Sequence, residues 1–379
     1  MKTRRQLFLE AQETQLREIP IDLLVEIFSR VPATTVATCR FVSKLWRSII
    51  DRPDFTELFL TMSWTRPRLL LFSFQIEGYI FFFSSPQPQN PDENSCLVAT
   101  CYHVHHIHSP SDYSTGFGSP LGGFICLQER RVSMVICNPV TGVSVSLPKM
   151  ESKSVNTYAK PFLGYDPIDK QFKVLCTKVD TKHTSYEQHE IMTLENGKYL
   201  WRKIQCEPHY PRSNGICIDG ILYYTASVNP WMEVSMVVLC FDVRSERFRF
   251  INIDGGASWM FSPFTLINYK GKLGAARITV SNLKRQLELW VLEDAMKCKW
   301  YKNIYTVPPR LQNFRLTVVG MTGSGEVVLS PLRFSDPFYI YYYNLERNSF
   351  TKFRIQGFER CEPTEVYTSL DYAENLKLM

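Results

Sequence analysis

The sequence predicts a mainly β protein that opens with a small α-helical module. Three observations support this fold class. Aromatic residues make up 13% of the 379 residues, and flat rings pack well on pleated sheets. Apolar residues at helical spacing gather near the N-terminus, whereas short apolar runs broken by Gly, Pro and Asn fill the remainder. We expect a flexible N-terminus over residues 1–15, a helical module over 16–55 and a β domain over 60–370.

Composition excludes several classes of protein. The formal net charge is +6, and the basic residues are interspersed with acidic ones, so no basic stripe predicts binding to nucleic acid. No stretch approaches the ~18 consecutive apolar residues of a membrane span, and the N-terminus carries no signal-peptide core. The 11 cysteines include no C-x-x-C pair. They therefore indicate reduced thiols, in the cytoplasm and/or the nucleus.

The first element of the head is predicted to be a helix between two prolines. Pro20 fits a first helical turn, where a missing N–H is tolerated, and Pro32 ends the helix. Its apolar residues recur at helical spacing: Leu23, Leu24, Ile27, Phe28 and Val31.

Two further short helices are expected before residue 55. Thr34 or Thr35 can cap the second, Ser43 can cap the third, and Pro53 ends it. Three helices of this length cannot bury all their apolar side chains among themselves. Some of these side chains must face the rest of the chain or another protein.

The head resembles an F-box. The stretch "IPIDLLVEIFSRVPATTVATCRFVSKLWRSIIDRPDF" follows the pattern of that module: Leu-Pro, a Leu-rich helix, a Pro-led second helix, then Val-Ser/Cys-Lys-x-Trp. The matching positions are Pro20, Leu23, Ile27, Val31, Pro32, Arg40, Val42, Ser43, Lys44, Trp46 and Ile49. Ile19 and Val36 depart from the usual Leu, and Cys39-Arg40-Phe41 stands where Phe-Arg-x is more common.

This resemblance implies docking to a Skp-family adaptor, and through it to the cullin and RING subunits of a ubiquitin ligase. An exposed face of Pro and aliphatic residues is the kind of patch that binds a protein. The adaptor-binding residues implied are Ile19, Pro20, Leu23, Leu24, Ile27, Val31, Pro32, Val36, Arg40, Val42 and Trp46. Trp46 is expected chiefly to fix the third helix against its neighbours.

The β region repeats with a period of about 50 residues. Five phrases share an apolar strand, a turn with Asn, Asp or Gly, and a second strand: "ICNPVTGVSVSLP", "IMTLENGKYLWRKI", "CFDVRSERFRFINI", "WVLEDAMKCKWYKNI" and "YYNLERNSFTKFRI". Gly-bearing hairpins such as "GICIDGILYYTA" lie between them. Two hairpins in each period make four strands, the content of one propeller blade. We expect roughly six to seven blades, with a stacked β-sandwich as the structural alternative.

The body is similar to the F-box-associated domain of a large plant family, which is kelch-like in architecture. "NPVTG…LP" and "GYDPIDKQFKV" are the most specific phrases of this resemblance. It implies a surface that recruits a protein substrate. The chain would then be the substrate-recognition subunit of an SCF-type (Skp–cullin–F-box) ubiquitin ligase, non-catalytic and without a cofactor.

The stretch "CYHVHHIHSP" offers the sharpest candidate for a metal site. His103 and His105 share one strand face, as do His106 and His108, and imidazoles at this spacing can bind zinc. No Cys, Asp or Glu at ligand spacing completes the set nearby, so a strand of alternating polar residues is the simpler interpretation, and no metal is expected.

Two other functions remain open from the sequence. One is an adaptor-bound regulator or a glycan-binding propeller without a role in degradation, with stacking faces from Trp201, Trp231, Trp259, Trp290 and Trp300. The other is an enzyme built on the propeller, although no P-loop, G-x-S-x-G or H-E-x-x-H motif occurs. Residues 84–95 form the longest predicted exposed loop and the first candidate for target contact.

Overall fold

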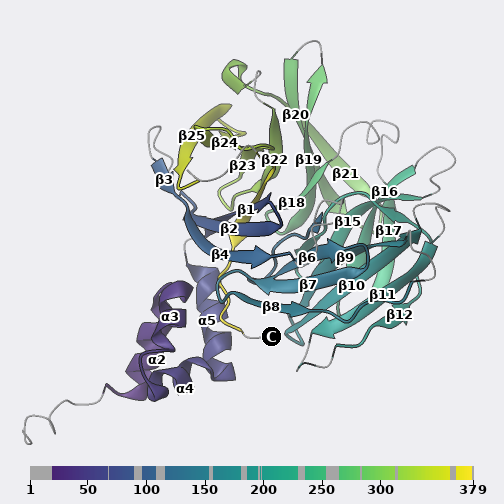
Figure 1. The fold of residues 1–379 in the computed structure, drawn as a ribbon. Coiled ribbons are helices and arrows are strands. Elements are labelled where there is room, and N and C mark those ends of the chain that lie inside the picture. The colour runs from purple at the N-terminus through teal and green to yellow at the C-terminus, as the bar shows by residue number, and fades with distance from the viewer. Residues whose placement is uncertain are drawn as a thin grey trace, which may run out of the picture. The chain divides into compact units, whose positions relative to one another are not determined.

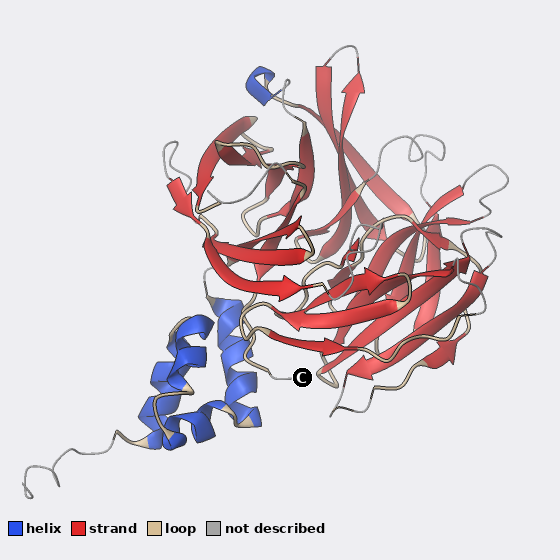
Figure 2. Cartoon of the chain, viewed as in Figure 1, coloured by secondary structure: helices blue, strands red, loops and turns tan. Residues whose placement is uncertain are grey.

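The computed structural model divides the chain into a helical unit and a β unit. It describes residues 19–66, 68–88, 96–107, 116–152, 157–180, 186–194, 197, 199–228, 235–252, 264–281, 284–311, 315–358 and 364–377. The helical unit comprises the described residues up to Thr65 together with Glu374–Lys377, and the β unit comprises those from Arg66 to Ala373. Figure 2 shows long helices only in the first unit and strands throughout the second.

The helical unit contains four helices in its described part, one more than we predicted. They are α2 (Ile21–Arg30), α3 (Ala33–Cys39), α4 (Lys44–Ile50) and α5 (Pro53–Thr65). Pro53 begins α5, whereas the prediction had it end the preceding helix. Proline is well tolerated at the first helical position, where its missing N–H has no intrahelical partner. Phe55 and Phe59 of α5 are buried, so this helix completes the core of the unit.

The helix caps match the predictions in part. Ser43 caps α4, since its hydroxyl accepts a hydrogen bond from the Trp46 backbone N–H at 3.1 Å. Neither Thr34 nor Thr35 caps α3. Pro32 is the N-cap residue there and makes no side-chain hydrogen bond.

The β unit is a six-bladed propeller, within the predicted range and unlike the β-sandwich alternative (Figure 1). Six antiparallel sheets follow one another along the chain, each built from four main strands in sequence order except at the closure. The first strands of most successive blades contact one another around the ring: β9 with β14, β14 with β18, β18 with β22 and β22 with β26.

The strands of the first three blades have the following bounds. The first blade has β26 (Val366–Tyr372), β1 (Leu69–Ile76), β2 (Tyr79–Pro86) and β4 (Thr100–His106). The second has β5 (Gly116–Phe117), β6 (Ile125–Arg130), β7 (Ser133–Asn138) and β8 (Val143–Ser146). The third has β9 (Thr157–Asp166), β10 (Gln171–Asp180), β11 (Tyr186–Leu194) and β12 (Arg202–Ile204).

The other three blades continue in the same order. The fourth has β13 (Tyr210–Pro211), β14 (Ile216–Ile218), β15 (Ile221–Val228), β16 (Ser235–Asp242) and β17 (Arg247–Asn252). The fifth has β18 (Thr265–Tyr269), β19 (Lys272–Ser281), β20 (Lys284–Asp294) and β21 (Lys299–Thr306), followed by the short helix η2 (Pro309–Leu311). The sixth has β22 (Leu316–Met321), β23 (Glu326–Pro331), β24 (Phe338–Asn344) and β25 (Ser349–Gln356), to which β3 (Cys96–Val98) adds in parallel.

Two crossovers close the ring. The C-terminal strand β26 pairs with β1, so the first blade combines one strand from the C-terminal end of the propeller sequence with three from its N-terminal end. The early strand β3 pairs with β25 of the last blade. The first and sixth blades are therefore held together by hydrogen bonds between segments some 250 residues or more apart in the chain. A ring of blades leaves only short, protected strand edges, which limits aggregation.

Four of the five repeated phrases, together with the phrase "GYDPIDKQFKV", form hairpins that share one kind of turn. The turn of the remaining phrase, "IMTLENGKYLWRKI", lies mostly outside the described residues. In each of these five hairpins, an Asn or Asp side chain accepts hydrogen bonds from the backbone N–H groups two and three residues later, which is the Asx turn. The residue four positions after this Asn or Asp has a positive φ angle. The five turns begin at Asn138, Asp166, Asp242, Asp294 and Asn344.

Candidate functional site: an exposed aliphatic face and a histidine–cysteine cluster

The helical unit has a filled core. Leu24 and Phe28 of α2, Val36 of α3, and Ile49 and Ile50 of α4 are buried. The Trp46 ring lies edge-on to Phe28 with 5.0 Å between ring centroids, the packing role expected for it. The unit therefore does not need its remaining aliphatic side chains for its own stability.

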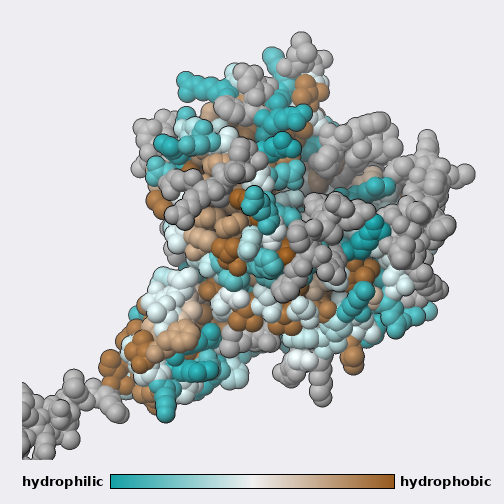
Figure 3. All heavy atoms as spheres, viewed as in Figure 1, coloured by the Kyte–Doolittle hydropathy of each residue, from teal (hydrophilic) through white to brown (hydrophobic). Residues whose placement is uncertain are grey.

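Those remaining side chains form an exposed face on α2. Leu23 and Ile27 are four residues apart, so they lie along one side of α2, and Ile19 lies just before the helix. Leu23 is 50% exposed and Ile27 is 48% exposed. Figure 3 shows apolar, brown atoms on the visible surface of this unit. We call Ile19, Leu23 and Ile27 the α2 aliphatic face.

Most of the predicted adaptor residues are at least partly accessible, and two of them are buried. Ile19, Pro20, Leu23, Ile27, Pro32 and Val42 are exposed, and Val31 and Trp46 are partly buried. Leu24 and Val36 are buried in the core of the unit and cannot present their side chains to a partner. The residue pattern could not separate Leu23 from Leu24, because only the packed helices decide which of two adjacent leucines faces inward.

Arg40 makes contacts inside the helical unit. Its guanidinium forms an ion pair with Asp51 at 3.0 Å and donates a hydrogen bond to the Leu376 carbonyl at 3.2 Å. The side chain is only 12% exposed. These contacts account for Arg40 without a partner protein.

The C-terminal residues Glu374–Lys377 complete the helical unit, which no local sequence pattern indicated. A Glu374 carboxylate oxygen accepts a hydrogen bond from the Ala33 backbone N–H at 3.1 Å, at the start of α3. Glu374, Asn375 and Leu376 are all buried. We call Glu374–Lys377 the C-terminal clasp. It supplies the cap that neither threonine of α3 provides.

Exposed apolar residues beyond the predicted set also lie on the helical unit. Phe41 is 89% exposed, and Ile21 and Leu45 are exposed as well. Phe41 follows α3, in the segment where the sequence departs from the usual F-box pattern. Phe41 lies in the turn between α3 and α4. That position could have indicated from the sequence that its side chain is exposed.

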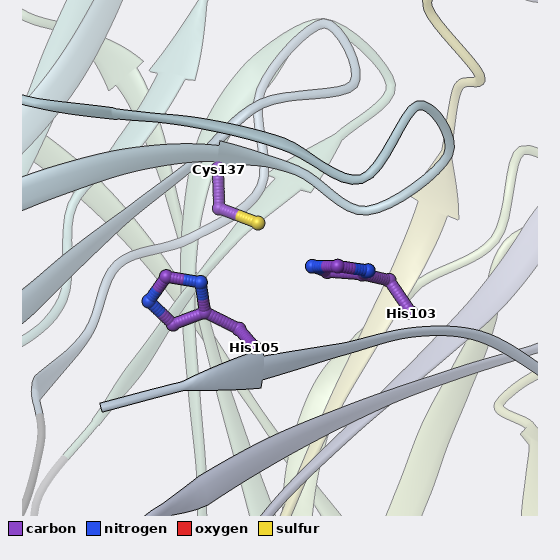
Figure 4. A group of neighbouring side chains, drawn as sticks. All are labelled: His103, His105 and Cys137. Carbon is purple, nitrogen blue, oxygen red and sulfur yellow. The ribbon is translucent and has the colours of Figure 1, made fainter. Parts of the chain in front are cut away.

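The structure brings two of the four predicted histidines together. His103 and His105 lie on one face of β4, and Cys137 of β7 in the second blade faces them (Figure 4). Ligand atoms of these three residues all lie within 4.8 Å of one another. His106 is exposed, and its ring contacts Tyr79 instead. His108 lies outside the described residues. We call His103, His105 and Cys137 the blade-seam cluster.

Burial shifts the pKa values of Cys137 and His103 in this cluster. It raises the pKa of the Cys137 thiol to about 11. Burial, together with the neighbouring His105, lowers the pKa of His103. His105 is held at the cluster by two hydrogen bonds: Nε2 lies 2.9 Å from a Glu129 carboxylate oxygen, and Nδ1 lies 3.2 Å from the Ser144 hydroxyl.

The predicted stacking tryptophans and the candidate target loop do not form a recognisable site in the described residues. The Trp201 and Trp300 indole N–H groups donate to the backbone carbonyls of Pro148 and Asn252, and Trp290 is buried. Trp231, Trp259 and residues 89–95 of the candidate target loop lie outside the described residues. No helix in the described part of the chain is long and apolar enough to cross a membrane.

Comparison with known proteins matches both units. Residues 16–58 match the F-box domain, and residues 69–373 match the F-box associated beta propeller domain. F-box protein At1g53790 of Arabidopsis thaliana is 56% identical, over 99% of this chain and 86% of that protein. F-box protein DOR of the same plant is 41% identical and is matched over the full length of both chains. The chain therefore belongs to the F-box proteins that carry an F-box associated β-propeller domain.

Proposed function

We propose that this chain is the substrate-recognition subunit of an SCF-type ubiquitin ligase. The helical unit would dock to a Skp-family adaptor, which links it to the cullin and RING subunits, and the propeller would recruit the protein to be ubiquitinated. The chain would act in the cytoplasm and/or the nucleus. It would contribute no catalytic group, because holding the target near the ligase raises its effective concentration.

The α2 aliphatic face is the observation that carries this proposal. Ile19, Leu23 and Ile27 remain exposed although the helical unit has a complete core of its own. Exposed aliphatic side chains aligned on one helix face are suited to burial against a partner. Pro20, Pro32 and Val42 supply further exposed apolar contacts, and Val31 and Trp46 lie partly accessible beside them. Leu24, Val36 and Arg40 are left out of the proposed surface, since they serve the unit internally.

The test is the affinity of the purified chain for a purified Skp-family adaptor. The double substitution Leu23→Asp and Ile27→Asp places two charges in the proposed interface, and we expect binding to weaken at least ~100-fold. The matched control is Ile168→Asp with Val280→Asp on the propeller, where the native side chains are 65% and 67% exposed. The control should bind as the unchanged chain does. Equal affinities for all three proteins would refute the proposal.

The second half of the proposal needs its own measurement. Proximity labelling in cells with the full chain, compared with a chain lacking residues 1–55, should give shared neighbours that contact the propeller. Adaptor, cullin and RING subunits should disappear from the truncated sample. Shared neighbours that accumulate when the proteasome is inhibited are the expected substrates, and a complete lack of such proteins would argue against a role in degradation.

A further inference from the structure

The blade-seam cluster combines ligand types that zinc prefers. Imidazole nitrogen and thiolate sulfur bind Zn²⁺ at about 2.0–2.3 Å, which places the ligand atoms roughly 3.5 Å apart in a tetrahedral site. The ligand atoms of His103, His105 and Cys137 already lie within 4.8 Å of one another. Small side-chain rotations, of about 1 Å at the ligand atoms, would complete the coordination.

The hydrogen bonds of His105 fix which of its nitrogens carries the lone pair. A carboxylate only accepts hydrogen bonds, so the 2.9 Å contact with Glu129 places the ring proton on Nε2. Nδ1 then carries the lone pair, which faces the Ser144 hydroxyl at 3.2 Å. Metal-binding histidines commonly donate their second nitrogen to a carboxylate in this way, which fixes the ring and raises its basicity.

Gly142 is an independent indication that the space beside the His103 ring must stay free of a side chain. It occupies the positive-φ position of the Asn138 turn, φ 70°. The equivalent positions of the other four Asx turns carry side chains: Lys170, Glu246, Cys298 and Asn348. Backbone conformation alone therefore does not demand glycine here. A Cβ atom at residue 142 would lie 3.2 Å from Nδ1 of His103, so the missing side chain admits the imidazole.

A second cluster of the same composition shows what a non-binding arrangement looks like. His189, Cys206 and His209 also bring their ligand atoms within 4.8 Å. Nδ1 of His209 lies 2.9 Å from the Glu207 carbonyl and must carry the proton, and Nε2 accepts from the Tyr224 hydroxyl at 2.8 Å. Both nitrogens of His209 are thus used, and its ring stacks on that of His189 with centroids 4.6 Å apart.

By contrast, neither imidazole nitrogen of His103 has a hydrogen bond to the residues that the structure describes. The two clusters therefore differ in available lone pairs, although their residue types are the same. Both nitrogens of His209 are engaged, whereas neither nitrogen of His103 is. Nδ1 of His105 would have to exchange only the 3.2 Å contact with the Ser144 hydroxyl for the metal.

We propose that His103, His105 and Cys137 bind one zinc ion that joins the first and second blades of the propeller. His105 would coordinate through Nδ1, Cys137 through its thiolate, and a water molecule would take the fourth position. Glu129 acts as a positioning residue that orients His105. The ion would hold β4 of the first blade, which also contains the C-terminal strand β26, against β7 of the second blade.

The experiment measures zinc binding to the full chain after removal of metal with a chelator. Titration of Zn²⁺ against a chromophoric competitor should show one tight site. His103→Asn should abolish that site, and Glu129→Gln should weaken it about 10–100-fold. His189→Asn and Cys206→Ser, in the second cluster, are the matched controls and should keep full stoichiometry. Cys137 is buried, so His103→Asn, at a half-buried position, is the safer test of the folded protein.

Cobalt(II) identifies the sulfur ligand. The cobalt-loaded chain should show a thiolate-to-cobalt charge-transfer band that Cys137→Ser removes and Cys206→Ser retains. Zn²⁺ should also raise the thermal unfolding midpoint of the unchanged chain and leave that of His103→Asn unmoved, because a ligand stabilises the state that binds it. Absence of a stoichiometric site, or equal loss in the two clusters, would each overturn the proposal.

Discussion

The helical unit and the propeller use their apolar side chains in opposite ways. In the helical unit, the aliphatic residues Leu23 and Ile27 are about half exposed beside a core that is already complete. In the propeller, the ring of Phe358 is buried among five other phenylalanines at the closure of the first and sixth blades. A small module can leave such side chains free to bind a partner, whereas the closed ring depends on burying them. The two units should therefore respond differently to the same kinds of change.

Phe358 contacts five other phenylalanine rings at that closure. The partner rings come from strands β1, β2 and β24 and from the segment before β24. Centroid distances are 5.2 Å to Phe72, 4.9 Å to Phe74, 5.2 Å to Phe83, 5.8 Å to Phe334 and 5.8 Å to Phe338.

The largest effect is expected from Phe358→Ala. Removal of this ring leaves a cavity that the surrounding rings cannot fill, and we expect the propeller to lose about 3–5 kcal/mol of unfolding free energy. Denaturant unfolding followed by tryptophan fluorescence measures this. The exposed Tyr301→Ala, in the same unit, is the control and should change stability by less than about 0.5 kcal/mol. Similar losses for both would show that closure does not depend on this cluster.

Acid should weaken the propeller and spare the helical unit. All seven histidines lie after residue 102, so the helical unit has none. Burial, with the neighbouring His209, lowers the pKa of His189 to about 3, and burial lowers the pKa of His209 to about 4. The unfolded chain takes up these protons near pH 6.5 and the folded chain does not, so their contribution to stability is present above that pH and falls as the pH drops toward the folded pKa values.

We expect each of these two histidines to cost the propeller about 2 kcal/mol of unfolding free energy between pH 7 and pH 5, about 4 kcal/mol together. Hydrogen exchange resolved by peptide can follow the two units separately over this range. His209→Gln should reduce the pH dependence, while substitution of the exposed His106 by Gln should leave it intact. A pH dependence of equal size in the helical unit would contradict this assignment.

A smaller effect is expected at the C-terminal clasp. Glu374→Ala leaves the Ala33 backbone N–H without its acceptor and removes a negative charge from the start of α3. The helical unit should lose about 1–2 kcal/mol, read as faster hydrogen exchange in α3, with the propeller unaffected. Lys377→Ala, at an exposed neighbour in the same segment, should have no effect. Faster exchange in the propeller instead would show that the clasp serves the other unit.

The smallest effect on stability should come from the α2 aliphatic face. Leu23→Ala removes a half-exposed side chain, and we expect a change within about 0.5 kcal/mol. Its neighbour Leu24→Ala, in the core, should cost about 2–5 kcal/mol. Thermal or denaturant unfolding of this adjacent pair tests the division between surface and core. Equal costs would mean that the face packs within the chain and is unavailable to the adaptor.

Much of the architecture was predictable because local patterns repeat. The 50-residue period placed the outer hairpins of the blades, and the Asx residues of those hairpins marked the turns. Helix α5 was missed because Pro53 was interpreted as a helix end, while the same residue can equally open a helix. Local sequence could not distinguish these cases without knowing that Phe55 and Phe59 fill the core.

Some features of the candidate sites were predictable from local sequence, and others depend on tertiary contacts. Ser43 as a cap and Trp46 as a packing residue followed from local spacing. Local spacing did not predict that Leu23 is exposed and Leu24 buried. It also did not predict the contacts of Arg40 inside the helical unit. Cys137 lies more than 30 residues after His103, in another blade, so no spacing rule could join them.

The sequence alone determined the class of the protein, the helical head and the repeating blades, because these depend on periodicity within a few residues. Tertiary structure decided which aliphatic residues stay exposed, how the C-terminal residues complete both units, and which histidines meet a cysteine. Each of these depends on contacts between segments far apart in the chain. Such contacts arise only when the ring of blades closes and the chain end folds back onto the helices.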